Sequence, residues 1–389
     1  MYIHIQIENT IQILYTYFAT MSSNTSKFQK RLQLMLKDPF WSGQPFWLLN
    51  LFTFKQDEHG STDKSRAAFR EYLASAQKYT AKVFSSNDNK KYPNENAAAK
   101  AWFETARLVS VNAFCPFPMH ENGYGVDAVV MFEYASPESL IQNVVGNSGY
   151  ANAATARVAA EAHHVALAVK PGHLANSHKE LSDYFDVNKK YHDKLWKNFL
   201  NSSISGSHKH VNTENIKPIL FPKNKDMKSL LSGEAGMKLD EPFYAINLLK
   251  YKNTKEQSIS QSREWNHRYH RHVNNLIEST FPSPAGMQLF ATPCMSLSCE
   301  IDWDEVCIMT YDCFKSFLTL RSVPGYDNGG EYREKALLTQ NLILTQPQLL
   351  NGYANGNFKV APDGNSEGLK DPFPSVVYNS IYGGEEAKL

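Results

Sequence analysis

Two pairs of tyrosine and arginine recur with the same spacing in distant parts of the chain. Arg157 follows Tyr150 by seven residues (157 − 150), and Arg333 follows Tyr326 by seven (333 − 326). On a helix this spacing places both side chains on one face, two turns apart. The arginine fork could bind a carboxylate or an enolate and the tyrosine could donate a proton, so all four are candidate catalytic residues. The structural alternative is an ion pair or a stacked tyrosine that only supports the fold.

Asn50 and Asn247 interrupt apolar segments that are rich in aromatic residues. Alternation along a strand gives each segment two faces. The face that we expect beneath the helices holds Trp47, Leu49 and Leu51, matched by Tyr244, Ile246 and Leu248. The asparagine face holds Phe46, Leu48, Phe52 and Phe54, matched by Phe243, Ala245, Leu249 and Tyr251.

If the asparagine face looks into a barrel cavity, each amide could orient a carbonyl or hydroxyl of a ligand. Phe52, Phe54 and Tyr251 would then join Asn50 and Asn247 as ligand-binding residues. A buried amide costs free energy unless it is hydrogen-bonded. The alternative is that each asparagine bonds a neighbouring side chain or the backbone and holds its strand in place.

Glu133 lies in an apolar segment, where alternation places it on one face with Val129 and Met131. A carboxylate in an apolar cavity is favoured in its neutral form and could serve as a catalytic base. The matching residue in the second half of the chain is Thr310, so the chain could have a single active site. The alternative is a glutamate that faces solvent or is paired.

The histidines do not predict a metal site. His267 and His270 would share a helix face but His272 would point elsewhere, so we expect exposed helix histidines here. His163 and His164 precede the last predicted strand of the first half. The sequence contains no CxxC, GxGxxG, P-loop or HExxH motif, and we expect no cofactor and no metal.

The elements that must position these residues occur twice. Residues 45–55 and 242–252 share proline, phenylalanine, asparagine, leucine and lysine at an offset of 197 (242 − 45), and the same offset carries Tyr72 onto Tyr269. Residues 127–134 resemble 304–311, and the tyrosine–arginine pairs match at an offset of 176 (326 − 150). The first copy is therefore longer by about 21 residues (197 − 176), which we place in the polar stretch 85–104. These matches predict a tandem duplication.

Each copy has the order β-α-β-β-α-β of a ferredoxin-like unit, which makes the fold class α+β. The helix that begins at Ser136-Pro137-Glu138 has a favourable N-cap and a favourable first residue. The other predicted elements of the first copy are strands 46–54, 108–114, 128–134 and 164–169 and helix 65–83. Those of the second copy are strands 243–251, 287–291, 306–311 and 341–345 and helix 263–277.

Four features together resemble the DUF1330 family. They are the strand that ends in Asn-Leu-x-x-[Phe/Tyr]-Lys, the tyrosine of the next helix, the Ser-Pro-Glu helix start, and the tyrosine that is followed by an arginine seven residues later. That family belongs to the dimeric α/β-barrel superfamily, and the resemblance covers both copies, roughly 43–173 and 239–350. The chain departs from the pattern at Cys313-Phe314-Lys315, which replaces Ser-Pro-Glu. Gly149 and Gly325 stand where the family has a glutamate.

The resemblance implies that the two four-stranded sheets enclose a barrel with helices outside. One chain would carry both halves as an intramolecular pseudo-dimer, which could assemble into a further homo-oligomer. Some members of the superfamily bind haem, so His163 or His164 could be an axial ligand in a haem-dependent oxidase.

The leading hypothesis is a cofactor-independent enzyme with proton-transfer, isomerase, lyase or oxygenase-type chemistry on a small, partly apolar carbonyl or acid. The alternative of another class is a non-catalytic ligand-binding or stress-response module.

Composition excludes several classes of partner. Lys and Arg total 40 and Asp and Glu total 39, so the net charge of +1 recruits neither nucleic acid nor an acidic membrane. The five cysteines include no CxxC pair, which favours reduced thiols in an intracellular protein. No stretch reaches the roughly 18 apolar residues of a membrane-spanning helix.

The segments outside the two copies complete the predicted organisation. Residues 1–42 form an N-terminal extension, of which the first 20 could be absent from the mature protein. Residues 174–238 form a linker with an amphipathic helix at 179–200, and residues 351–389 form an irregular tail. The tail ends in Ala387-Lys388-Leu389, a variant of the peroxisomal address that an import receptor reads. We therefore expect a cytoplasmic protein, or a peroxisomal one if this tripeptide is read.

Overall fold

A computed structural model describes most of both predicted copies. The described residues are 23–80, 107–113, 126–145, 148–171, 188–191, 193–194, 197, 240, 243–281, 289–298, 301–320 and 323–350. The predicted insertion at 85–104, the tail at 351–389 and the first 22 residues lie outside them. Of the predicted linker helix, residues 188–191, 193–194 and 197 are described, and all are helical.

Within the described residues, the first half of the chain has four strands and four helices. The strands are β1 (Phe46–Phe54), β2 (Arg107–Ala113), β3 (Ala128–Tyr134) and β4 (Glu161–Val169). The helices are α2 (Ser23–Lys37), α3 (Asp63–Thr80), α5 (Pro137–Val145) and α6 (Ser148–Ala160). The predicted N-cap of α5 is confirmed, because the Ser136 hydroxyl accepts from the backbone N–H of Ser139 at 3.2 Å.

The second half repeats the order of strands. They are β5 (Phe243–Tyr251), β6 (Leu289–Ser296), β7 (Glu305–Tyr311) and β8 (Leu337–Leu350). Its helices are α9 (Ile259–Thr280), α10 (Phe314–Leu320), the short 3-10 helix η4 (Tyr326–Gly329) and α11 (Gly330–Ala336). Helix α9 begins with a capping box in which Ser258 and Gln261 satisfy each other's backbone N–H groups.

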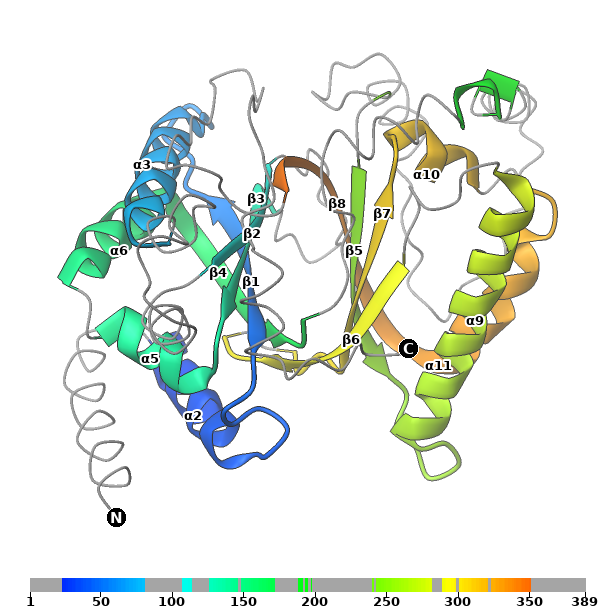
Figure 1. The fold of residues 1–389 in the computed structure, drawn as a ribbon, viewed down its shortest axis with the longest axis horizontal. Coiled ribbons are helices and arrows are strands. Elements are labelled where there is room, and N and C mark those ends of the chain that lie inside the picture. The colour runs from blue at the N-terminus through cyan, green and yellow to red at the C-terminus, as the bar shows by residue number, and fades with distance from the viewer. Residues whose placement is uncertain are drawn as a thin grey trace, which may run out of the picture.

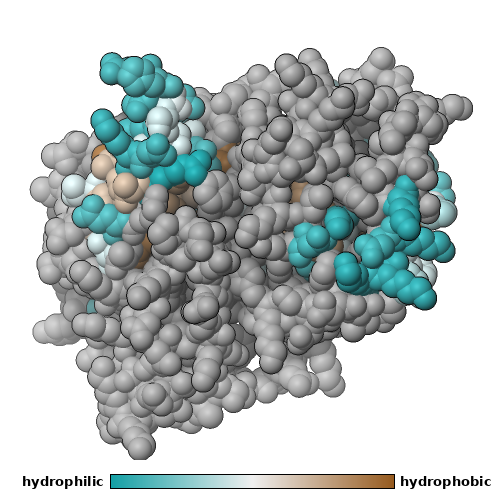
Figure 2. All heavy atoms as spheres, turned by 90° about the horizontal axis from the view of Figure 1, so that it is seen from above, coloured by the Kyte–Doolittle hydropathy of each residue, from teal (hydrophilic) through white to brown (hydrophobic). Residues whose placement is uncertain are grey.

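The eight strands close into an antiparallel barrel in the order β1-β3-β2-β8-β5-β7-β6-β4. Each half therefore contributes four adjacent strands, and the halves join where β2 pairs with β8 and β4 pairs with β6. Helices α3 and α6 cover the first half on one side, and α9 and α11 cover the second half on the opposite side (Figure 1). On the face in Figure 2 the described residues form two largely hydrophilic patches, one on the α3 side and one on the α9 side.

The assignment of strand faces from the sequence was inverted. The barrel interior is a cluster of Trp47, Leu49 and Leu51 with Tyr244, Ile246 and Leu248 of the other half. Phe46, Leu48, Phe52 and Phe54 instead belong to the core on the helix side of the sheet, which also contains Phe69, Tyr72 and Leu73 of α3. Both faces of the strands are apolar, so alternation separates the faces but cannot say which one lies inside.

The lysine that ends the shared strand motif makes the same contact in both halves. Lys55 donates from Nζ to the carbonyl of Val158 at 2.6 Å, close to the C-terminus of α6. Lys252 donates to the carbonyl of Glu334 at 2.5 Å, close to the C-terminus of α11. A lysine at this position satisfies helix-end carbonyls that have no partner within the helix, and its charge opposes the helix dipole. The motif therefore fastens a strand to the helix that covers it.

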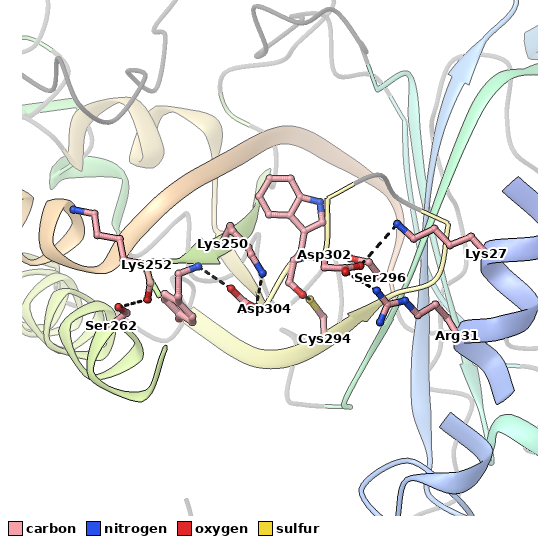
Figure 3. Close-up of polar contacts among 11 residues, drawn as sticks. Lys27, Arg31, Lys250, Lys252, Ser262, Cys294, Ser296, Asp302 and Asp304 are labelled. Carbon is pink, nitrogen blue, oxygen red and sulfur yellow. Dashed lines mark hydrogen bonds and ion pairs between the residues drawn. The ribbon is translucent and has the colours of Figure 1, made fainter. Parts of the chain in front are cut away.

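Helix α2 is an addition to the predicted barrel, because it lies within the segment expected to be an extension. Its residues Leu32 and Met35 are buried in the core beneath the first-half helices. From its other side Arg31 and Lys27 reach Asp302 in the β6–β7 loop of the second half, with the arginine nitrogen 2.5 Å from the carboxylate (Figure 3). Among the described residues no helix is long and apolar enough to cross a membrane.

Candidate functional site

A pocket in the second half lies between the sheet and its covering helices. It has a volume of about 50 Å³, and residues of β5, β7 and β8 form one wall while α9, η4 and α11 form the other. Most of the lining is apolar. Its polar side chains are Asn247, Asn266, Tyr269, His270, Tyr311, Tyr326 and Arg333. Three candidates from the sequence, Asn247, Tyr326 and Arg333, therefore meet in one place.

Arg333 is held in the pocket by two neighbours. Its Nη1 donates to the Tyr269 hydroxyl at 3.3 Å, and its Nη2 donates to Gln340 Oε1. Its guanidinium carbon also lies 4.7 Å from the centroid of the Tyr269 ring, a cation–π contact. These contacts fix the orientation of a cation beside a partly apolar cavity, where its attraction for an anion is stronger than in water.

Tyr326 reaches the same tyrosine, since its hydroxyl lies 3.1 Å from that of Tyr269. It follows Gly325, which has a φ of 89°, a conformation that side chains with a Cβ rarely adopt. His272 Nε2 lies 2.8 Å from the Gly325 carbonyl and ties this turn to α9. A Cβ on Gly329 would lie 2.8 Å from His272 Cδ2, so glycine is required for this close approach.

The spacing of seven does not place Tyr326 and Arg333 on one helix, as the sequence suggested. Tyr326 begins η4, whereas Arg333 lies in the separate helix α11. The break at Gly329 and Gly330 changes the helix type, yet both side chains converge on Tyr269. In the first half Tyr150 and Arg157 do share one helix, α6, although the Tyr150 side chain is outside the described part.

His270 is buried rather than exposed, which corrects the expectation for this histidine. Only 8% of its surface is exposed, and its Nε2 lies 3.2 Å from Asn266 Nδ2. Burial lowers the pKa of His270 to about 3, although the charge of Glu305 opposes this shift. The ring is therefore neutral at pH 7. Cys307 also lines the pocket, and burial raises the pKa of its thiol to about 12, which keeps it protonated and unreactive.

Tyr251 and the first-half aromatic candidates lie outside the pocket lining. The Tyr251 hydroxyl donates to Glu305 Oε1 at 2.7 Å and accepts from Asn266, which does line the pocket. Phe52 and Phe54 pack against Phe69 of α3, with ring centroids 5.2 and 5.1 Å apart. They belong to the core beneath the helix.

The first half places different groups around its asparagine. Asn50 donates from Nδ2 to the carbonyls of Leu48 at 3.1 Å and Val130 at 3.3 Å. Its Oδ1 lies 3.0 Å from His164 Nε2. The amide is thus engaged on both sides, as expected for an asparagine that holds its strand in place.

His164 does not fit the role of a haem ligand. Its Nδ1 lies 3.4 Å from Arg157 Nη1 and its Nε2 contacts Asn50, so both ring nitrogens are engaged. The ring also stacks on Phe52 with centroids 4.8 Å apart. Burial holds the pKa of His164 well below its usual range, with Arg157 lowering it further. No group of three or more His, Cys, Asp or Glu residues within the described ranges could hold a metal ion.

Glu133 lies away from the pocket, because its strand position faces the barrel interior. It accepts from Trp47 Nε1 at 2.8 Å, and only 2% of the residue is exposed. The two residues are directly opposite each other in the β1–β3 register. Its proposed catalytic role stays a prediction.

Four polar groups of the second half were not among the candidate site residues: Asn266, Tyr269, His270 and Gln340. The repeat contained a signal for two of them. Tyr269 matches Tyr72 at the offset of 197, and Gln340 follows Arg333 by the same seven residues by which His164 follows Arg157. Asn266 and His270 had no such signal, because the first half has Phe69 and Leu73 at these positions.

No protein-family model matches the chain, and no curated protein sequence matches it. Solved structures with a partly similar arrangement include a protein of Lactobacillus acidophilus NCFM that is provisionally called a monooxygenase. It is 7% identical with a TM-score of 0.38, and the match covers 80% of this chain and 97% of that one. A second provisional monooxygenase, from Fusobacterium nucleatum, is 9% identical with a TM-score of 0.37 and coverage of 78% and 93%. A provisional chlorite dismutase is 8% identical with a TM-score of 0.36 and coverage of 78% and 95%. Likeness at this level supports no inference about activity.

Proposed function

We propose that the chain is a cofactor-independent enzyme that acts on a small, partly apolar carbonyl compound or acid in the pocket of its second half. The observation that carries the proposal is the convergence of Arg333, Tyr326 and Tyr269 on a partly apolar cavity. A fixed cation and hydroxyl groups in such a place stabilise a carboxylate or an enolate oxygen. The cavity of about 50 Å³ is far below the roughly 300–1,000 Å³ of drug-sized sites, which favours a ligand of a few non-hydrogen atoms.

Each polar side chain has a role in this proposal. Arg333 would bind the negative charge, and Asn247 on β5 would orient a carbonyl or hydroxyl. Tyr326 would carry a proton to or from the ligand, with Tyr269 linking it to Arg333. His270, neutral at pH 7, would contribute a hydrogen bond without a charge.

Differences between the halves favour a single site. Leu73 and Phe69 stand in the first half where the second has His270 and Asn266, and both are buried in an apolar core. We also propose that the halves descend from a duplicated DUF1330-like domain. The matched lysine–carbonyl contacts of the two halves support that origin.

The test uses three small probes: acetate, pyruvate and propanal. Ligand-observed NMR measures their binding to the full chain, with propan-1-ol as a control that lacks an acidic or carbonyl group. Exchange of the pyruvate methyl protons for deuterium in D2O measures proton transfer, because exchange requires an enol or enolate. Arg333→Lys and Tyr326→Phe remove the two main groups, and Arg157→Lys is the matched control in the first half.

We expect pyruvate to bind and to exchange faster with the wild-type chain and the Arg157→Lys control than with either pocket variant. Binding without accelerated exchange would favour the non-catalytic alternative, a ligand-binding module. Failure of all three probes to bind, in protein that unfolds cooperatively, would overturn the proposal.

A further inference from the structure

A chain of four buried polar side chains leads from β7 through β5 to α9, where its last two members line the pocket. The Tyr251 hydroxyl lies 2.7 Å from Glu305 Oε1, and Asn266 Nδ2 lies 3.1 Å from the same hydroxyl. Asn266 Nδ2 also lies 3.2 Å from His270 Nε2. Only His270 exceeds 2% exposure, at 8%. Buried polar groups that are linked in this way constrain one another's hydrogen-bond directions.

Glu305 sets the direction of the first bond because it is ionised. Burial would raise the pKa of Glu305, but hydrogen bonds from His267 and Tyr251 lower it below its usual range. Arg263 Nε and His267 Nε2 lie 3.4 and 3.7 Å from Glu305 Oε2 and stabilise the charge. An ionised carboxylate only accepts, so Tyr251 must donate its proton to Glu305.

The next two bonds then follow from donor and acceptor counting. With its proton directed at Glu305, the Tyr251 oxygen can only accept, so Asn266 must present its NH2 group rather than its carbonyl oxygen. The second N–H of that group faces His270 Nε2, which must accept it. A neutral imidazole has one protonated nitrogen, and the proton of His270 is therefore on Nδ1.

We propose that Glu305, acting through Tyr251 and Asn266, is a positioning residue that holds His270 as the neutral Nδ1–H tautomer. Its importance for catalysis rests on the proposed function of the pocket. In this tautomer Nε2 is occupied, so a hydrogen bond from the ring to a bound molecule comes from Nδ1–H. Together with the Arg333 guanidinium this makes the site rich in donors, which selects a ligand through acceptor oxygens, as in a carboxylate or an enolate.

Contacts between β7 and β5 also hold Glu305 and Tyr251 next to each other. Asp304, directly before Glu305, accepts from Lys250 Nζ at 2.9 Å and from the backbone N–H of Tyr251 at 2.8 Å. Figure 3 shows Lys250 and Asp304 facing each other beside the β6–β7 loop. The first half has the corresponding backbone contact, from Phe54 to Asp127 at 2.7 Å.

The first half nevertheless lacks the hydrogen-bond chain. Buried apolar residues stand at all four corresponding positions: Phe54, Phe69, Leu73 and Ala128. The same scaffold thus folds without the network, so its presence in the second half is not a requirement of the barrel. Replacing a residue of the network by its first-half counterpart therefore introduces a side chain that the same scaffold already accommodates.

The test is the tautomer of His270 in the full chain labelled with 15N-histidine. Two-bond and three-bond couplings to the ring protons distinguish Nδ1–H from Nε2–H. The chain has 13 histidines, and the signals missing from His270→Leu assign this one. Tyr251→Phe introduces the residue that the first half carries at this position and removes the acceptor of Asn266. Asn266→Asp replaces the donor group that faces Nε2 with an acceptor.

We expect the Nδ1–H form in the wild type, a gain of the proton at Nε2 in Asn266→Asp, and a mixture of both forms in Tyr251→Phe. An Nε2–H wild type, or unchanged signals in Asn266→Asp, would overturn the proposal. Unchanged signals in Tyr251→Phe would remove Glu305 and Tyr251 from the positioning role. The tautomer is read without ligand, so failure of pyruvate to bind would count against the proposed function and not against this network.

Discussion

The guanidinium of Arg333 lies over the ring of Tyr269 and also donates to its hydroxyl, at 4.7 Å from the centroid and 3.3 Å from the oxygen. Arginine is suited to this dual contact because its planar group stacks and donates at once, whereas a lysine ammonium is a compact point charge. Tyr269 thereby connects the cation of α11 to Tyr326 of η4. This three-residue arrangement is the part of the site on which binding should depend most.

Arg333→Lys should therefore weaken pyruvate binding by tenfold or more, since a charge-assisted hydrogen bond contributes roughly 1.5–3 kcal/mol. The charge is kept, but the planar fork is lost. Isothermal titration calorimetry measures the change. Arg157→Lys alters the same position of the first half and should leave the affinity unchanged; equal loss in both variants would place the site elsewhere.

Acid should destabilise the fold partly through His270. Burial lowers the pKa of His270 from 6.5 to about 3 in the folded chain. Between these values the unfolded chain binds a proton that the folded chain does not, so the free energy of unfolding falls as the pH decreases. The contribution of neutral His270 to the free energy of unfolding is fully present above pH 6.5. As the pH falls, it is lost at about 1.4 kcal/mol per pH unit, or about 2 kcal/mol by pH 5.

Urea unfolding of the wild type and His270→Leu at pH 7.5 and pH 5 isolates this contribution. Leucine stands at the matching position of the first half, as Leu73. The variant should lose about 2 kcal/mol less than the wild type over this interval. Parallel losses in the two proteins would contradict a neutral, buried His270.

Gly325→Ala should destabilise the second half by about 1–2 kcal/mol, because the φ of 89° brings a Cβ too close to the following carbonyl. Gly325→Asn is the control, since asparagine tolerates this conformation better than alanine. Thermal unfolding measures both. If the two variants had the same stability, side-chain crowding rather than backbone conformation would be the cause.

Variants of Glu133 test whether proton transfer takes place in the barrel interior or in the pocket. Glu133→Gln keeps an oxygen that can accept from Trp47, whereas Glu133→Leu removes it and should cost about 1–3 kcal/mol of stability. We expect pyruvate exchange to persist in both variants, because Glu133 does not line the pocket. Loss of exchange in well-folded Glu133→Gln would instead support a catalytic base inside the barrel.

The order of elements could be predicted from the sequence because its signals are local. Strand β1 begins and ends at the predicted residues 46 and 54, and β3 at 128 and 134. The proline before β1 and the Ser136-Pro137 helix start act within a few residues of chain. The two matched offsets also located Asn247, Tyr326 and Arg333, which meet in the pocket.

Tertiary structure decided what those residues do. Both faces of β1 are apolar, and only packing against α3 and the opposite half determined which face lies inside the barrel. Asn50 became a strand-holding group and Asn247 a pocket residue because their neighbours differ, with His164 near one and Arg333 near the other. The Glu305 network joins β5, β7 and α9 through contacts up to 54 residues apart, and hydrogen-bond geometry of this kind is set only when the chain closes.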